Sequence, residues 1–253
     1  MNGGPGKLYH KIKRLTGRAI GDFNLIDSGD RILVAVSGGK DSYTLFYILN
    51  ELKKRAPVDF ELIAVTIDAG YPGYQHHVIT EHLTQAGFRH ITKQTNAYRI
   101  IEKKRRPGSS YCAFCARLRR GSIYTAATEL GCNKIALGHH LDDFIETLLL
   151  NQFYTGTLGA MSPKYLADND KHIVIRPLVY VEEADIIRFA RENKYPIICC
   201  ACPVCVRVDQ KRKRVKKLLS DLAVDIPQVK QSMLASLGNV HPGHLLDKRL
   251  KDF

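Results

Sequence analysis

The stretch ILVAVSGGKDS, which begins at residue 32, ends an apolar, β-branched run in two glycines followed by charged and hydroxyl side chains. Gly38 and Gly39 let backbone amides approach a ligand closely because no Cβ stands in the way. The start of a following helix adds partial positive charge, Lys40 adds a full charge, and Ser37 and Ser42 offer hydroxyls. The stretch therefore predicts a phosphate cradle at the carboxyl end of a buried strand.

Two widespread phosphate-binding patterns do not fit this turn. The Walker loop needs a glycine five residues before its Gly-Lys pair, and Val34 stands there. The GxGxxG dinucleotide pattern is also missing. A plain strand-to-helix turn would explain two glycines alone, but the full SGGKDS set directly after VAV favours a phosphate site, because it supplies every type of phosphate contact.

A second polar stretch, LGHHLDD, follows another apolar run. Asp142 and Asp143 are hard oxygen ligands of the kind that Mg²⁺ prefers. Capping of the following helix is the structural alternative. Beside a nucleotide loop we favour contact with Mg²⁺ or ATP. His139 and His140 stand next to them, and the sequence does not distinguish a chemical role from packing.

The seven cysteines gather in two motifs. YCAFCARLRRG carries a C-x-x-C pair, and CCACPVC carries overlapping C-x-x-C pairs: Cys112 and Cys115, then Cys199, Cys200, Cys202 and Cys205. Thiolates at this spacing suit zinc or an iron–sulfur cluster, and spacing alone does not choose between them. Buried, unreactive cysteines are the structural alternative, and we assign that role to Cys132.

Basic residues flank both cysteine motifs. KKRR (103–106) precedes the first motif, Arg117, Arg119 and Arg120 follow it, and KRKRVKK (211–217) follows the second. With a formal net charge of +13, these runs predict a nucleic-acid partner bound through its phosphates. Few aromatic residues are interleaved, so base stacking is not predicted.

The elements that must position these residues alternate along the chain. We expect five buried strands, RILVAV, ELIAVTID, RHITKQT, KIALGH and HIVIRPL, separated by helices at about 8–20, 45–52, 78–87, 115–130, 144–153 and 182–195. This alternation predicts βαβ units around a parallel sheet, with ligands at the carboxyl ends of the strands.

We expect one core domain with additions at both ends. Residues 1–30 read as a basic helix and loop, 31–206 as the nucleotide-binding α/β domain with an inserted cysteine motif, and 207–253 as a helical tail. The chain has no apolar run of twenty residues, and its first twenty residues lack the apolar core of a secretory signal. We therefore expect a cytoplasmic protein with reduced thiols and no membrane contact.

SGGKDS resembles the PP-loop of the ATP pyrophosphatase superfamily, whose members bind ATP, adenylate a carbonyl or carboxyl oxygen and release pyrophosphate. The resemblance implies an α/β fold with a Rossmann-like sheet of the adenine nucleotide alpha-hydrolase type, flanked by helices and extended by N-terminal and C-terminal helices. The nucleotide contacts that it implies are Val36, Ser37, Gly38, Gly39, Lys40, Asp41, Ser42, Thr66, Ile67, Asp68, Gly138, Asp142 and Asp143.

The order of motifs narrows the resemblance. SGGKDS, C-x-x-C-x-R-L-R-R-G, LGHHxDD, a late C-x-x-C and the closing GNVHPGHLLDKRLKDF are together similar to the tRNA 2-thiocytidine synthetase family over residues 24–253. That family holds a [4Fe-4S] cluster on three cysteines and leaves the fourth iron open for sulfur. The implied ligands are Cys112, Cys115 and Cys202. An ungapped match from YPII would choose Cys200, and Cys199 and Cys205 remain further alternatives.

The resemblance also implies a reaction. ATP and Mg²⁺ would activate O2 of cytidine 32 in a tRNA anticodon loop, and sulfur from the cluster would replace the oxygen. The implied catalytic set is Lys40, Asp41, Asp143 and Arg117. Arg117 and Arg120 could hold either a tRNA phosphate or the sulfur on the cluster, and the sequence does not separate these roles. The implied partners are tRNA, a sulfur donor (a cysteine desulfurase system or free sulfide) and a second copy of the chain in a homodimer.

Several alternatives remain open at this point. A related PP-loop enzyme could thiolate a uridine, or transfer a persulfide without a cluster. A lysidine-forming synthetase would share the loop and the basic charge but leave the paired cysteines unexplained. A zinc-stapled RNA-binding module without catalysis would explain the cysteines but would not need the phosphate cradle.

Overall fold

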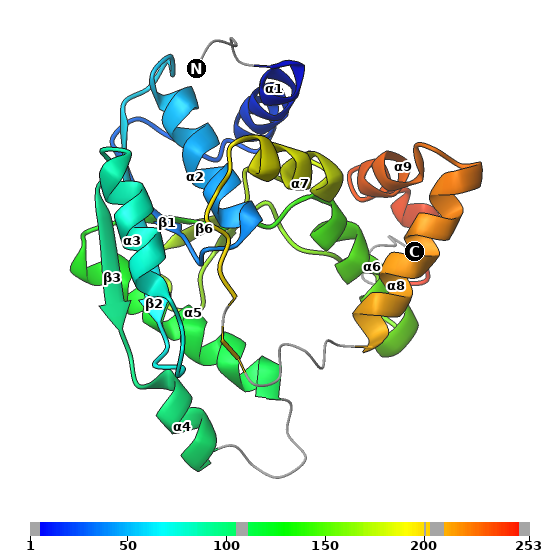
Figure 1. Ribbon diagram of the computed structural model, residues 1–253. Coiled ribbons are helices and arrows are strands. Elements are labelled where there is room, and N and C mark those ends of the chain that lie inside the picture. The colour runs from blue at the N-terminus through cyan, green and yellow to red at the C-terminus, as the bar shows by residue number, and fades with distance from the viewer. Residues whose placement is uncertain (1–5, 105–110, 200, 203–209, 248–253) are drawn as a thin grey trace. The chain divides into compact units, whose positions relative to one another are not determined.

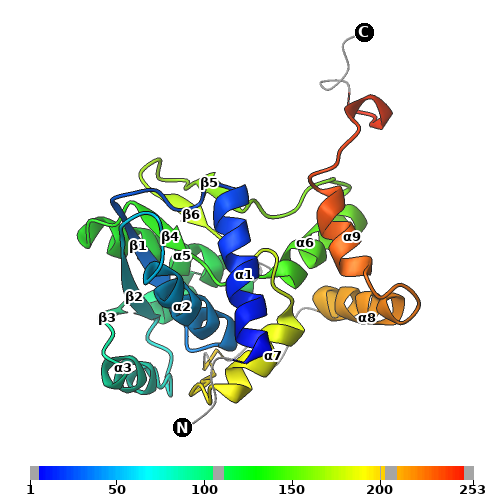
Figure 2. The same ribbon diagram turned by 90° about the horizontal axis from the view of Figure 1, so that it is seen from above.

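The computed structural model describes residues 6–104, 111–199, 201–202 and 210–247, with the side chain of Cys112 left out. The chain divides into two compact units, Met1–His140 with Ser162–Val208, and Leu141–Met161 with Asp209–Phe253. The predicted domain limits at residues 30 and 206 stay a prediction. The first unit contains the sheet, and the second is helical (Figures 1 and 2).

The first unit is built on a six-stranded sheet in the order β3-β2-β1-β4-β6-β5. Neighbouring strands run parallel except for β5, which pairs antiparallel with β6 at one edge. The strands are β1 (Asp30–Ala35), β2 (Phe60–Asp68), β3 (His90–Gln94), β4 (Lys134–Ala136), β5 (Lys164–Leu166) and β6 (Ile173–Ile175). The predicted α/β fold with a parallel sheet is confirmed.

Both faces of the sheet are covered, which explains why its central strands read as continuous apolar runs. Successive side chains of a strand point to opposite faces. Ile32 and Val34 of β1 accordingly pack into one hydrophobic cluster, while Leu33 between them packs into another. A parallel strand with an apolar residue at every position can be buried only in this way.

Four helices cover the Ile32 face: α1 (Lys7–Asp22), α2 (Lys40–Lys53), α3 (His76–Gln85) and α7 (Glu183–Glu192). Helix α5 (Tyr111–Glu129) covers the opposite face with Ile123, Ala126 and Ala127. Figure 1 shows α2 and α5 on opposite sides of the sheet. Figures 1 and 2 both show α1 beside α2 and α7, so the predicted N-terminal helix is packed on the core.

Two elements were absent from the prediction. Helix α4 (Ala97–Lys104) follows β3, and its buried residues are Ala97 and Ile101, which make too short a periodic signal. Strand β5 has three residues with Leu166 exposed at the sheet edge. Its pairing with β6 depends on tertiary structure, and no local sequence pattern predicts it.

The second unit packs helix α6 (Leu141–Thr155) against α8 (Gln210–Asp225) and α9 (Val229–Ser236), followed by a 3-10 turn at Pro242–His244. Its small apolar core contains Leu141, Ile145, Leu149, Val215 and Leu219. The spacing of four residues between the members from each helix places them on one helical face.

A buried acid lies beside this core. The carboxylate of Glu146, 2% exposed, lies 3.5 Å from Arg212 and 3.6 Å from Lys216. Part of the basic run 211–217 therefore neutralises an internal acid.

In the described part of the chain, no helix has the length and apolar character that a membrane crossing requires.

A buried lysine fixes the amino-terminal edge of the sheet. The Nζ atom of Lys134, at the start of β4, lies 2.6 Å from carboxylates of both Asp27 and Asp30 and donates to the Leu25 carbonyl at 3.0 Å. The hydrogen bond from Lys134 lowers the pKa of Asp27. The contacts tie the loop before β1 to β4, its neighbour in the sheet.

Replacing Lys134 with alanine should destabilise the fold strongly. The change leaves the Asp30 carboxylate, 4% exposed, without its cation. Breaking a buried ion pair in this way costs about 3–5 kcal/mol of unfolding free energy. Urea denaturation followed by circular dichroism measures the loss.

Lys54→Ala is the matched control, because Lys54 pairs with Glu51 at the surface, where such pairs contribute about 0–1 kcal/mol. Equal effects of the two substitutions would contradict the role given to Lys134.

Candidate nucleotide-binding and cysteine site

The glycine loop, residues 37–42, lies at the carboxyl end of β1. Val36 continues the strand direction, because its N–H donates to the Val65 carbonyl at 2.8 Å. Gly38 has a φ of 83°, and Gly39 is the extended N-cap residue of α2, which begins at Lys40. The backbone N–H groups at this helix start are those that α-helices leave without an internal partner. The loop thus has the local geometry of an anion site.

Gly38 has two reasons to be glycine. A positive φ is rarely adopted by other residues. A Cβ at this position would also lie 2.4 Å from Cγ1 of Ile198, whose backbone N–H donates to the Gly38 carbonyl at 3.1 Å. The segment that leads into the second cysteine motif is therefore packed directly on the glycine loop.

The serine hydroxyls brace the loop from within. The Ser37 N–H donates to Ser42 Oγ at 3.1 Å, and Ser42 Oγ donates to the Gly39 carbonyl at 2.9 Å. Ser42 is buried, and its hydroxyl takes part in both of these hydrogen bonds, which hold the turn. The sequence predicted these hydroxyls as ligand contacts, and that role stays a prediction.

Lys40 is held in its charged form. Its Nζ lies 3.1 Å from Asp41 and 3.0 Å from Glu183 of α7. Burial opposes the charge, yet the two carboxylates outweigh burial and raise the pKa of Lys40. Asp41 also lies 3.6 Å from Nε2 of His140, in the segment between β4 and the next helix.

Gly138, two residues after β4, lets the chain pass close to the start of α2. A Cβ on Gly138 would lie 3.0 Å from the carbonyl carbon of Asp41 and 3.2 Å from the backbone nitrogen of Ser42. The predicted site residue Gly138 thus lies against the glycine loop, where a larger residue would push the loop away.

The end of β2 carries three residues that were predicted to contact the nucleotide, Thr66, Ile67 and Asp68. Their side chains have different surroundings. Thr66 is buried, and its hydroxyl donates to the Val36 carbonyl at 2.7 Å and lies 2.9 Å from His90 Nε2. Burial and nearby His76 lower the pKa of His90 to about 4, so the ring is neutral at pH 7. Asp68 accepts a hydrogen bond from the Gly70 N–H at 2.9 Å. Of the three, Ile67 lines the pocket described next.

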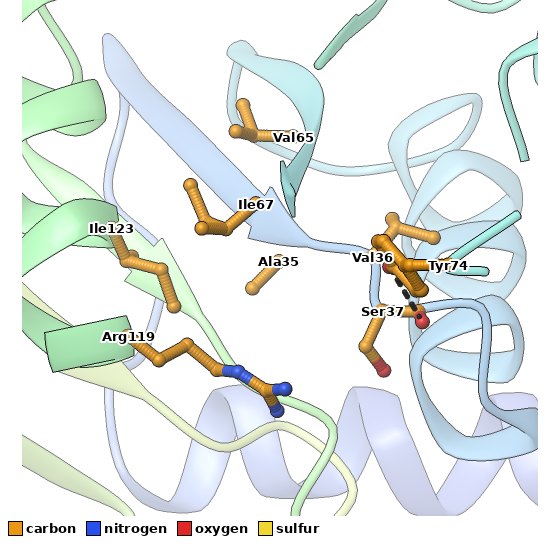
Figure 3. Close-up of a pocket in the computed structure, with 8 residues that line it drawn as sticks. All are labelled: Ala35, Val36, Ser37, Val65, Ile67, Tyr74, Arg119 and Ile123. Atoms are coloured by element: carbon orange, nitrogen blue, oxygen red, sulfur yellow. Dashed lines mark hydrogen bonds between the residues drawn. The ribbon is translucent and has the colours of Figure 1, made fainter. Parts of the chain in front are cut away.

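A pocket opens between the carboxyl ends of β1 and β2 and helix α5. It is lined by Ala35, Val36, Ser37, Val65, Ile67, Tyr74, Arg119 and Ile123 (Figure 3). Figure 3 shows the guanidinium of Arg119 extending toward the side where Ser37 lies. Mostly apolar walls with a few polar groups are typical of small-molecule sites.

Arg119, and not Arg117, is the arginine that lines this pocket. Residues four apart share a face of a helix, whereas residues two apart do not. Arg119 is therefore on the face of α5 that carries Cys115, about one turn (~6 Å) further along the axis. Arg117 and Arg119 are both exposed, so it is the pocket lining that separates them, and Arg120 lies 3.5 Å from Asp168.

Cys115 lies at one end of a chain of contacts that includes the hydroxyls of two tyrosines. Its Sγ lies 3.4 Å from the hydroxyl of Tyr71, which in turn accepts a hydrogen bond from the hydroxyl of Tyr111 at 3.2 Å. Burial, followed by the bonds to Cys115 and Tyr111, raises the pKa of Tyr71 far above its ordinary value. Tyr71 therefore stays protonated and keeps a hydrogen to donate.

Cysteines from both motifs reach the same place. Cys115 and Cys202 pack against one hydrophobic cluster, hereafter the Tyr71 cluster, whose buried members are Ala69, Tyr71, Ala97 and Ile101. Cys199 is exposed, and Cys132 is buried elsewhere in the core, as predicted. Cys200, Cys205 and the side chain of Cys112 lie outside the described residues. Among the residues that are described, no three His, Cys, Asp or Glu side chains form a metal-binding group.

The cysteines are close to the glycine loop. Ile198 contacts Gly38, and Cys202 follows Ile198 by four residues, which span at most about 14 Å. Tyr74 makes the same connection, because its hydroxyl donates to the Ser37 carbonyl at 3.2 Å while its ring packs against the Tyr71 cluster. The phosphate cradle and the thiols thus share one edge of the sheet.

Asp142 and Asp143 begin α6 in the second unit. The Asp142 carboxylate accepts a hydrogen bond from Lys230 of α9 at 2.6 Å. The Mg²⁺ role predicted for this pair stays a prediction. The N-terminal position on α6 also suits the capping alternative, because acidic residues in a first turn interact favourably with the helix dipole.

Sequence reasoning missed the residues that join the motifs. Tyr71, Tyr74 and Ile198 carry no chemical motif, and Arg119 could not be separated from its neighbours by composition. The helical spacing from Cys115 could have selected Arg119, and the Tyr-Pro-Gly-Tyr turn was a visible signal.

Comparison with known proteins agrees with this geometry. Residues 8–199 match the model of the PP-loop domain. The chain is 62% identical over 247 residues to a tRNA-cytidine(32) 2-sulfurtransferase of Syntrophotalea carbinolica, covering 98% of this chain and 95% of the relative. It is also 62% identical over 243 residues to the protein of the same name from Geobacter sulfurreducens, covering 96% and 95%.

A solved structure shares the fold. The U34-tRNA thiolase NcsA from Methanococcus maripaludis with its [4Fe-4S] cluster superposes with a TM-score of 0.75 at 21% identity, covering 92% of this chain and 78% of that chain. At this identity the likeness concerns the fold. The sequence matches, which span nearly the whole length, show more: the chain belongs to the PP-loop family and, within it, to the tRNA-cytidine(32) 2-sulfurtransferase family.

Proposed function

We propose that the protein is an ATP-dependent tRNA sulfurtransferase that converts cytidine 32 of a tRNA anticodon loop to 2-thiocytidine. The observation that carries the proposal is the meeting of Cys115 and Cys202 on the Tyr71 cluster, beside the glycine loop. A sulfur-handling site and a phosphate cradle at one sheet edge suit a reaction in which a nucleotide activates an oxygen and sulfur replaces it.

ATP is proposed to lie with its phosphates on the glycine loop and its base in the apolar pocket. Loop N–H groups and Lys40 would bind the pyrophosphate part, and Ile67 and Val65 would contact the base. Attack by O2 of cytidine on the α-phosphorus releases pyrophosphate and makes the oxygen part of a good leaving group, AMP. Fixed positive groups stabilise the charge that develops on the phosphates.

We assign to Arg119 a contact with the phosphates of ATP, a role that the sequence analysis gave to neither Arg117 nor Arg119. Lys40 is already flanked by two carboxylates, Asp41 and Glu183, so the cradle needs a further cation to attract a polyphosphate. Arg119 extends into the pocket toward Ser37, and its planar guanidinium suits bidentate contact with phosphate. Mg²⁺ bound by Asp142 or Asp143 would supply more positive charge, as proposed from the sequence.

The cysteines suit a [4Fe-4S] cluster. Their thiolates are soft ligands, and Cys115 receives the hydrogen-bond support that ligating groups commonly have. We propose Cys112, Cys115 and Cys202 as ligands. Cys202 packs on the Tyr71 cluster whereas Cys199 is exposed, which favours Cys202 of these two, with Cys200 and Cys205 as further candidates. Such a cluster, when bound, would supply an iron atom free to hold the sulfur to be transferred.

The basic surface is proposed to bind tRNA phosphates. Helix α8 exposes Lys213 and Arg214 in addition to the residues that pair with Glu146. Such contacts would position tRNA without reading its sequence. Three further proposals rest on the family alone. The sulfur donor is a cysteine desulfurase system or free sulfide, the protein is a homodimer, and its location is cytoplasmic.

Loss of Cys115 or Cys202 should abolish thiolation. Cys115→Ala and Cys202→Ala remove proposed ligands, and we expect 2-thiocytidine to fall at least about 100-fold because cluster binding is lost. Nucleoside mass spectrometry of tRNA thiolated by anaerobically reconstituted protein with ATP, Mg²⁺ and sulfide measures it. Cys132→Ala is the matched control, since Cys132 is buried elsewhere in the core. Thiolated uridine as the product, or activity independent of both cysteines, would overturn the proposal.

Lys40→Ala should slow adenylation without affecting the cluster. Removing a preorganised cation from the reacting phosphates typically costs about 10²–10³-fold in rate. Pyrophosphate release in the presence of tRNA measures the step, and the visible absorption of the reconstituted protein should match that of wild type. Lys53→Ala, at the far end of α2, is the control. Unchanged pyrophosphate release in Lys40→Ala would be incompatible with the proposed ATP site.

Arg119→Ala and Arg117→Ala form a pair that tests the choice of arginine. Because hydrogen bonds to charged groups contribute about 1.5–3 kcal/mol, Arg119→Ala should weaken ATP binding about 10–100-fold. Arg117→Ala should change it less than about threefold. Equilibrium dialysis with labelled ATP measures both, and the reverse order of effects would restore Arg117 to the site.

A further inference from the structure

The loop after β2 contains a rigid turn of four residues, Tyr71-Pro72-Gly73-Tyr74. The Tyr74 N–H donates to the Tyr71 carbonyl at 3.2 Å, and Gly73 has a φ of 80°. Proline at the second position and glycine with positive φ at the third are typical of a type II turn. The turn therefore fixes the separation and direction of the two tyrosines at its ends.

The two tyrosines contact the two halves of the site. The Tyr74 hydroxyl donates to the Ser37 carbonyl in the glycine loop at 3.2 Å. The Tyr71 hydroxyl lies 3.4 Å from Cys115 Sγ. One short turn thus connects the phosphate cradle with a thiol on α5.

The hydrogen-bond pattern gives the bond to Cys115 a direction. Tyr71 is 5% exposed, and its oxygen already accepts a hydrogen bond from Tyr111. If the Cys115 thiol also donated to this oxygen, the hydrogen of Tyr71 would be buried and would need another acceptor. If Tyr71 donates to the sulfur, every hydroxyl hydrogen in the chain from Tyr111 to Cys115 is used. A buried donor left unsatisfied is costly, so the second arrangement is favoured.

We propose that Tyr71 is a positioning residue that donates a hydrogen bond to the sulfur of Cys115, with Tyr111 as the outer donor of the chain. The bond holds the sulfur at a fixed orientation relative to the glycine loop. It also withdraws electron density from the sulfur when Cys115 acts as a ligand. The second effect rests on the proposed function, whereas the bond itself does not.

The bond can be tested in cluster-free protein by a double-mutant cycle of Tyr71→Phe and Cys115→Ala. Interacting residues give non-additive effects on stability, while independent residues give additive ones. We expect Tyr71→Phe to lower the urea midpoint in wild type and to lower it clearly less in the Cys115→Ala background. Tyr98→Phe is the matched control, because the Tyr98 ring lies 5.0 Å from the Tyr71 ring on the same cluster, and its effect should be additive with Cys115→Ala.

The effect on the ligand sulfur is read from the reduction potential of the reconstituted cluster. Hydrogen bonds to ligand sulfurs are among the factors that set this potential. Loss of the bond leaves more negative charge on the sulfur and disfavours added electrons. We therefore expect a more negative midpoint potential in Tyr71→Phe, a smaller shift of the same sign in Tyr111→Phe, and none in Tyr98→Phe.

The outcomes separate this inference from the proposed function. An additive cycle overturns the hydrogen bond whether or not a cluster forms. A non-additive cycle with equal potentials in Tyr71→Phe and wild type overturns the electronic effect. Absence of a cluster in the reconstituted wild type contradicts the proposed function, while the cycle still decides the bond. If Tyr71→Phe does not take up a cluster, the shift in Tyr111→Phe decides the electronic effect.

Discussion

The contact between Ile198 and Gly38 is the constraint on which the site depends. It consists of a backbone hydrogen bond and of apolar atoms filling the space where any other residue at position 38 would have its Cβ. Because the contact lies four residues before Cys202, the packing that shapes the phosphate cradle also limits how far this cysteine can lie from it. Residues about 160 positions apart in the sequence are thereby joined without a long side-chain bridge.

The charged side chains around Lys40 also affect how the glycine loop can bind an anion. Lys40, itself part of the glycine loop, lies between the carboxylates of Asp41 and Glu183. This arrangement orients the lysine and keeps it protonated, but it does not by itself attract an anion. In the proposed function, the backbone amides of the helix start, the guanidinium of Arg119 and bound Mg²⁺ would supply that attraction. The role proposed for Arg119 follows from this charge balance as much as from its place in the pocket.

Local patterns were sufficient for most of the fold. Continuous apolar runs such as ILVAV predicted the parallel strands because both faces of this sheet are covered, and the glycine loop was predicted at the correct strand end. Helix α4 and strand β5 were missed because two buried residues or three strand residues make no periodic signal. The choice between Arg117 and Arg119, and the tyrosine bonds to Ser37 and Cys115, depend on side-chain directions that appear only when α5 is docked. Sequence alone could propose cysteines as metal ligands, but it could not find the tyrosine that contacts Cys115.

The Tyr-Pro-Gly-Tyr turn limits how this region can change over evolution. Surface loops usually accept insertions and deletions, because their ends tolerate many connecting lengths. Here both ends of the turn are occupied, one by the Ser37 carbonyl and the other by the Cys115 sulfur. A single added residue would rotate one ring away from its partner, so a relative with a longer loop at this point must support its cysteine by other means.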